Sequence, residues 1–173
     1  EAARIDRVYD ACGREIETRF YGADDQPSRE PELGVAAVLR QFDPCGNAIE
    51  TRHLGIDGQP ALDWEAGAAQ IVRTYDTRDF QTRVAYFDVD GRPREGGEAG
   101  VAAIDTAYDD AGRLIYARYY EVDGRPSQHI ARISTEFASR TRIMRCFDGD
   151  NRPMAHPFDG AAVSIDTYDA YGM

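Results

Sequence analysis

The chain has 173 residues, with 31 acidic and 20 basic side chains, and a formal net charge of −11. A pI near 4.7 and the lack of a basic stripe disfavour binding to nucleic acid or to an anionic membrane surface. No apolar run is long enough to cross a bilayer, so we expect no membrane insertion. Three scattered cysteines are too few for a disulfide scaffold and contain no CxxC pair, which leaves the compartment open, with an extracellular or periplasmic location slightly favoured.

One motif recurs along the whole chain: an aromatic residue that in most copies precedes aspartate. It stands at Tyr9, Phe42, Tyr75 and Tyr108, each 33 residues after the last, and then recurs at shorter spacing. Such self-similarity is typical of tandem-repeat proteins. We therefore divide the chain as one array, 1–173, with repeats at 9–41, 42–74, 75–107, 108–136 and 137–167, the end of a preceding repeat at 1–8 and the start of a further one at 168–173.

The segments on either side of each aromatic motif alternate between apolar and polar residues. After the first motif, Ile16, Thr18 and Phe20 fall on one face of residues 15–20, and charged residues fall on the other. Residues 101–108 alternate in the same way. A period of two predicts strands and argues against the paired helices of other repeats of similar length.

Two kinds of turn separate these strands. An Asp-x-x-Gly turn follows the aromatic residue, with Gly13 in the first copy and Asp79 in place of glycine in the third. Aspartate caps such a turn and glycine supplies its positive φ, which predicts an antiparallel hairpin. At the other end of the hairpin, an Asp-Gly or similar pair leads to proline, where we expect pairing to stop because proline cannot donate to a ladder. Loops of variable sequence follow at 28–33, 61–66 and 94–99.

These elements together predict an all-β fold. Each repeat of about 33 residues contributes two strands, and a single hairpin cannot bury its aromatic face alone. We expect the antiparallel hairpins to stack into a continuous twisted sheet or coil of about eleven strands.

The stretch from Tyr108 to Leu114, Tyr-Asp-Asp-Ala-Gly-Arg-Leu, resembles the YD repeat of bacterial RHS-type proteins. Residues 9–14 match the same pattern nearly as well, and the resemblance extends over 9–167 through short turn motifs. It implies a β-hairpin wall, scaffold or binding surface in a larger bacterial protein. The period here is longer than is usual in that family, and the pattern also resembles WG and MORN-like arrays.

A few residues are candidates for binding. Asp88, Asp90, Asp148 and Asp150 place acidic oxygens two residues apart beside a turn, as calcium loops do, although plain turn chemistry, which needs no ion, is the favoured interpretation. No cofactor other than this possible calcium is indicated. His53 takes a strand position held by Phe20 in the first copy, so we interpret it as a replacement for a packed aromatic residue.

Two aromatic residues, Trp64 and Phe158, stand in the variable loops, where the repeat does not require them. They are candidates for contacting a partner, and the alternative is that they cap the sheet.

Taken together, the sequence favours a non-catalytic module for scaffolding or protein–protein interaction, acting through open sheet ends or the loop-rich edge. An extracellular carbohydrate-binding or adhesion module that uses Trp64 is the alternative. A small hydrolase would require a pocket within residues 127–157.

Overall fold

The computed structural model describes residues 3–138, 140–156 and 160–168, and all of its regular elements are β-strands. The chain forms two compact units, Glu1–Ala102 and Ala103–Met173. No helix in the described residues is long and apolar enough to span a membrane. The structure thus confirms the predicted all-β class built from antiparallel hairpins.

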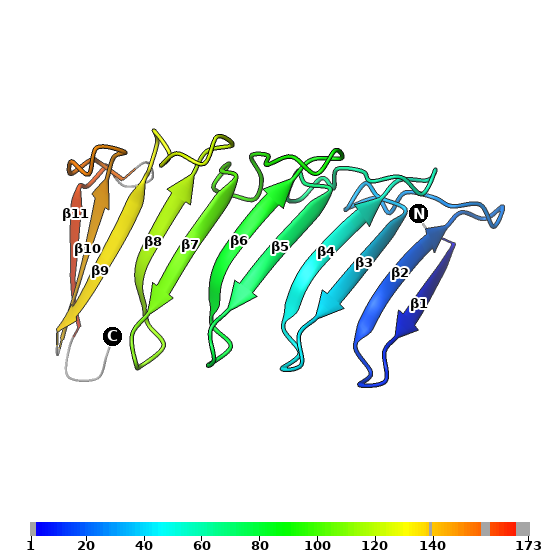
Figure 1. Ribbon diagram of the computed structural model, residues 1–173, viewed down its shortest axis with the longest axis horizontal. Helices are drawn as coiled ribbons and strands as arrows, with labels where there is room; N and C mark the ends of the chain where they lie inside the picture. The colour runs from blue at the N-terminus through cyan, green and yellow to red at the C-terminus, as the bar shows by residue number, and fades with distance from the viewer. Residues whose placement is uncertain (1–2, 139, 157–159, 169–173) are drawn as a thin grey trace. The chain divides into compact units, whose positions relative to one another are not determined.

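The first unit contains six strands that pair in chain order, each antiparallel to its neighbour (Figure 1). The strands are β1 (Arg4–Tyr9), β2 (Glu15–Tyr21), β3 (Ala37–Phe42), β4 (Ala48–Leu54), β5 (Gln70–Tyr75) and β6 (Gln81–Phe87). Pairing within a hairpin is longer than pairing between hairpins: β3 and β4 share six paired positions, whereas β2 and β3 share three. The hairpin is therefore the structural unit of the repeat.

The second unit repeats this plan with five strands in chain order. They are β7 (Ala103–Tyr108), β8 (Leu114–Tyr120), β9 (Arg132–Ala138), β10 (Thr141–Phe147) and β11 (Val163–Thr167). β7 pairs with β8 and β8 with β9, and β10 lies between β9 and β11. The single array over 1–173 stays a prediction.

The Asp-x-x-Gly turns close the hairpins as the sequence predicts. In the first turn, the Gly13 amide donates to the Asp10 carbonyl (3.0 Å), and the Asp10 side chain accepts from the Cys12 and Arg14 amides. Gly13 has a φ of 79°, and Asp79 adopts the same left-handed conformation at 64° in the third turn. Aspartate tolerates this conformation better than most residues, which explains the exception.

The expectation that pairing stops at proline is wrong. Pro27 forms an antiparallel bridge with Tyr21, and the Ser28 amide beyond it donates to the Phe20 carbonyl (2.9 Å). Equivalent bridges form at the prolines of the other four copies. The hydrogen bonds fall on either side of Pro27, so its missing amide hydrogen is not required there.

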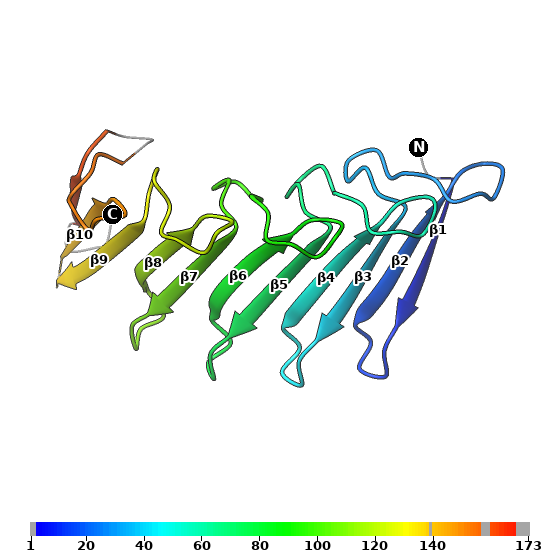
Figure 2. The same cartoon turned by 45° about the horizontal axis from the view of Figure 1, so that its top comes forward.

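The variable loops of the first unit cover one face of its sheet. Phe20, Val35 and Val38 form a buried cluster, against which Leu33 and Ala61 of two successive loops pack. These loops lie along the end of the strands opposite to the hairpin turns (Figure 2). Burial of this cluster requires both the sheet and its loops, because the strands alone leave the face open.

Candidate functional site

Neighbouring loops of the first unit are joined to one another by backbone hydrogen bonds. The Trp64 amide donates to the Leu33 carbonyl (2.9 Å), and the Gly97 amide, at the equivalent position 33 residues later, donates to the Ala66 carbonyl (2.8 Å). The three loops therefore form an ordered layer over the sheet.

Trp64, the only tryptophan, is 64% exposed and rests on the preceding loop. Its indole ring covers Gly34 so closely that a Cβ at that position would overlap the ring atoms. This contact favours the interpretation that Trp64 caps the sheet. Part of the ring is exposed, and its contact with a partner stays a hypothesis. Phe158 lies outside the described residues.

A groove of about 520 Å³ lies between this loop layer and the sheet of the first unit. Its floor comes from β3 to β6 and its rim from the loops. The polar groups on the floor are Arg40, Thr51, His53, Arg73 and Tyr86, and the acidic groups of the rim are Asp63, Glu65 and Glu98.

The two arginines of the floor occupy the same position in successive copies but differ in their partners. Arg40 pairs with Glu15 at 2.7 Å. Hydrogen bonds from Thr18 and Arg40 lower the pKa of Glu15, against the opposing effect of its partial burial. Arg73 donates to the Thr51 hydroxyl (3.3 Å) and forms no ion pair with any carboxylate of the described part of the chain. Arg73 is therefore a cation on the groove floor that no described carboxylate contacts as an ion pair.

His53 and Asp63 are buried and hold the second loop in place. Asp63 accepts hydrogen bonds from the amides of Ala66 and Ala68, both at 2.9 Å. The His53 Nδ1 lies 2.9 Å from the Ala68 carbonyl oxygen, which can only accept, so Nδ1 carries the proton. The 3.7 Å from that nitrogen to Asp63 is too long for a hydrogen bond. These contacts give the pair a structural role.

Tyr86 is half-buried beneath the third loop. Burial raises the pKa of its phenol, an effect that Arg73 opposes and Glu98 reinforces. A Cβ at Gly97 would collide with the Tyr86 hydroxyl, so this loop approaches the ring only because Gly97 has no side chain. The groove thus presents hydrogen-bond donors on its floor and carboxylate acceptors on its rim.

The aspartates considered for calcium are engaged within their own turns. Asp88 accepts from the amides of Asp90 and Arg92, and Asp148 accepts from those of Asp150 and Arg152 in the same way. The outer aspartates, Asp90 and Asp150, each pair with the arginine two residues later, at 2.8 and 2.9 Å. Within the described ranges, no three His, Cys, Asp or Glu residues are grouped as a metal site would need. Calcium binding stays a hypothesis, and turn chemistry accounts for these contacts.

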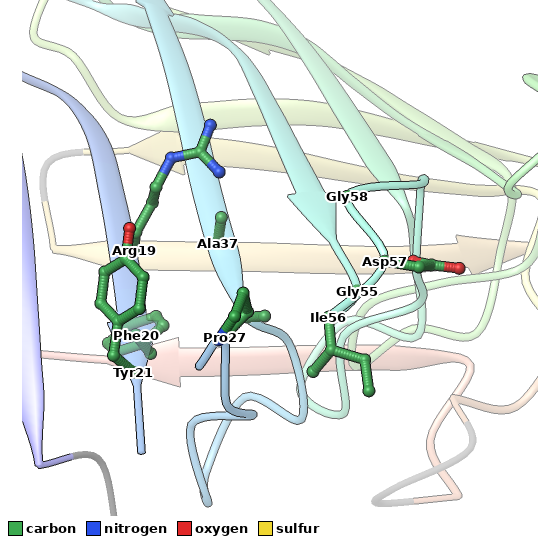
Figure 3. A pocket seen from close by; sticks show the side chains of 10 residues that line it. Arg19, Phe20, Tyr21, Pro27, Ala37, Gly55, Ile56, Asp57 and Gly58 are labelled. Atoms are coloured by element: carbon green, nitrogen blue, oxygen red, sulfur yellow. The ribbon is translucent and has the colours of Figure 1, made fainter. Parts of the chain in front are cut away.

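A smaller cleft lies on the opposite side of the first unit, beside the Asp-Gly turn (Figure 3). It measures about 170 Å³ and is lined by Arg19, Tyr21, Pro27 and the turn 55–58, among others. A cleft of about 270 Å³ occupies the corresponding place in the second unit. The clefts thus recur with the repeat.

Comparisons with known proteins identify no relative: no protein-family model and no curated protein matches the sequence.

Sequence reasoning overlooked Arg40, Arg73 and Tyr86. The signal was present, because Arg40 and Arg73 are 33 residues apart and share the face of a strand with buried apolar residues. A cation at such a position indicates an open place on an otherwise covered face.

Proposed function

We propose that the chain is a non-catalytic repeat module that binds a protein partner on the loop-bearing face of its first unit. The observation that carries this proposal is the groove beneath the ordered loops, with Arg73 on its floor forming no ion pair with a carboxylate of the residues that the structure describes. The resemblance to bacterial hairpin repeats agrees with a scaffolding or binding role.

The chemistry of the groove fits a peptide segment better than a neutral sugar. Arg73 offers a positive charge, Glu65 and Glu98 offer negative charges on the rim, and Leu33 and Ile71 offer apolar surface. A peptide can satisfy all three with an acidic, a basic and an apolar side chain. A neutral oligosaccharide would leave the Arg73 charge unanswered, and desolvating a charge without a partner opposes binding.

Panning of a phage-displayed random dodecapeptide library against the purified chain tests this proposal. We expect enriched peptides that carry an acidic residue, and we expect Arg73→Gln to weaken their binding at least tenfold. Arg52→Gln is the matched control, because Arg52 lies on the other face of the sheet and pairs with Glu50 at 2.7 Å.

Two results would overturn the proposal. Peptides that bind both variants equally would show that the groove is not their site. Failure to enrich any peptide, together with retention of the chain on a neutral glycan array, would favour the carbohydrate-binding alternative.

Self-association through β1 is a second candidate function. Among the described residues, β1 pairs only with β2, and it leaves Ile5, Val8 and Tyr9 exposed. An exposed edge strand invites strand addition by a further hairpin of the same type. Small-angle scattering over a concentration series would show elongation that Val8→Lys abolishes. Ile56→Lys, at a similarly exposed residue in a turn, should leave it intact, and size independent of concentration would refute this second function.

A further inference from the structure

The cleft of the second unit contains two arginines that face each other across neighbouring strands. Arg118 on β8 is paired directly with Arg132 on β9, and both line the cleft together with Tyr116 and Asn151. Like charges at directly opposed positions destabilise an antiparallel pair. The arrangement therefore costs stability. Asp105, opposite Arg118 on β7, offsets part of this cost, whereas Arg132 has the neutral Phe147 opposite it on β10.

The first two copies avoid this repulsion at the same position. Arg19, which corresponds to Arg118, is opposite Ala37, and Arg52 is opposite Gln70. Figure 3 shows Arg19 with Ala37 on the neighbouring strand in the equivalent cleft. The pairing of two arginines is thus a departure of the fourth copy and not a property of the repeat.

The fourth copy also lacks the glutamate, two residues earlier on the same strand, that pairs with this arginine in the first two copies. Glu17 pairs with Arg19, and Glu50 pairs with Arg52 at 2.7 Å. Tyr116 takes the place of these glutamates two residues before Arg118. Neither Arg118 nor Arg132 forms an ion pair with another described residue.

Arg132 is held in place by neutral groups. Its guanidinium stacks on the Phe147 ring at 3.7 Å, and one terminal nitrogen donates to the Asn151 side-chain oxygen at 2.6 Å. Asn151 takes the left-handed turn position, with a φ of 64°, where Gly58 stands in the second copy. The Nε of Arg132 is buried without a hydrogen-bond partner, and an unsatisfied buried donor is costly.

We propose that this cleft binds a carboxylate group, supplied by an acidic side chain of a protein ligand. Two guanidinium groups present a planar set of donors that matches the two oxygens of a carboxylate. One bound carboxylate would offset the repulsion between Arg118 and Arg132 and supply an acceptor beside them. Asp105, opposite Arg118 on β7, and Asp148 at the cleft disfavour a phosphate dianion more than a single negative charge.

Titration of the full chain with glutarate, followed by NMR of the arginine Nε–H resonances, tests the proposal. We expect saturable shifts confined to Arg118 and Arg132. Arg118→Gln should weaken binding at least tenfold, whereas Arg52→Gln should not change it. Asn151→Gly, which restores the residue of the second copy, should weaken binding several-fold because Arg132 loses its orienting acceptor.

Three outcomes would overturn this assignment: no saturable shift, equal shifts in the Arg118→Gln protein, or tighter binding of inorganic phosphate than of glutarate. The site lies in the second unit and does not depend on the groove of the first. Arg73→Gln should therefore leave glutarate binding unchanged, so failure of the groove and failure of this site can be told apart.

Discussion

The contact between Trp64 and Gly34 makes the loop layer testable through two glycines at equivalent positions. Gly34 and Gly67 have φ values of 72° and 67°, so alanine is strained equally at both. Left-handed backbone costs a residue with a side chain about 1 kcal/mol relative to glycine. A Cβ at Gly67 meets nothing within 4 Å, whereas a Cβ at Gly34 overlaps the Trp64 ring.

The difference between the two variants measures what the Trp64 contact contributes. With 64% of its surface exposed, Trp64 buries about a third of it. For a side chain of this size, that fraction is on the order of 90 Å², or about 2 kcal/mol at 25 cal/mol per Å². We expect Gly67→Ala to lower the free energy of unfolding by about 1 kcal/mol and Gly34→Ala by about 3 kcal/mol.

Urea unfolding followed by tryptophan fluorescence reports on the first unit, because Trp64 is the only tryptophan. The emission maximum of the folded protein should shift to the red in Gly34→Ala and stay constant in Gly67→Ala. In the Trp64→Ala background, followed by circular dichroism, the two glycine variants should lose equal stability. Equal losses in the wild-type background, with unchanged emission, would show that the indole does not rest on Gly34 and would refute the capping role.

Three further perturbations test the turns and the groove. Hydrogen bonds from the Arg113 side chain and backbone lower the pKa of Asp109. The contribution of this carboxylate to the free energy of unfolding is therefore present above about pH 4 and is lost as the pH falls through the lowered pKa. Asp109→Asn should flatten the acid side of a plot of urea midpoint against pH. Burial raises the pKa of Tyr86, so stability should fall as the pH rises above about 10, and Tyr86→Phe should reduce that loss and remove one late-titrating phenol from a titration followed at 295 nm. Glu15→Gln removes the carboxylate that Arg40 contacts and should cost about 1 kcal/mol in urea unfolding; an unchanged midpoint at low ionic strength would contradict that role.

The strands and hairpin turns were predictable because their signals are local. Alternation in residues 15–20 and the glycine four positions after most of the aromatic residues determine strand and turn within a dozen residues. Even the exception at Asp79 follows the same backbone geometry. The continuation of pairing past Pro27 was missed, because a proline is compatible with a ladder wherever its nitrogen faces away from the hydrogen bonds.

The groove and the loop layer were harder to predict because their contacts join residues about one repeat apart. The hydrogen bond from Trp64 to Leu33 depends on loop conformation, which variable sequence does not reveal. The face shared by Arg40 and Arg73 could be deduced from the period alone. The period also places Ala48 where Glu15 stands in the first copy, but that Glu15 contacts Arg40 across the pair of strands β2 and β3 becomes clear only in the structure.

Because the copies share one fold, residues at equivalent positions can be compared within the chain. This comparison shows which substitutions between copies preserve the fold and which call for a functional explanation. Replacing glycine by Asp79 keeps the turn, and replacing an aromatic residue by His53 keeps a buried side chain, so both preserve the fold. The change from glutamate to Tyr116 removes a counterion, and the change from a neutral residue to Arg132 adds a repulsive charge. The stacking of Arg132 on Phe147 adds a packing contact, but it leaves the Arg132 Nε buried without a hydrogen-bond partner. Two costly departures at one cleft are better explained by a ligand than by folding, which is why Arg118 and Arg132 point to a binding site.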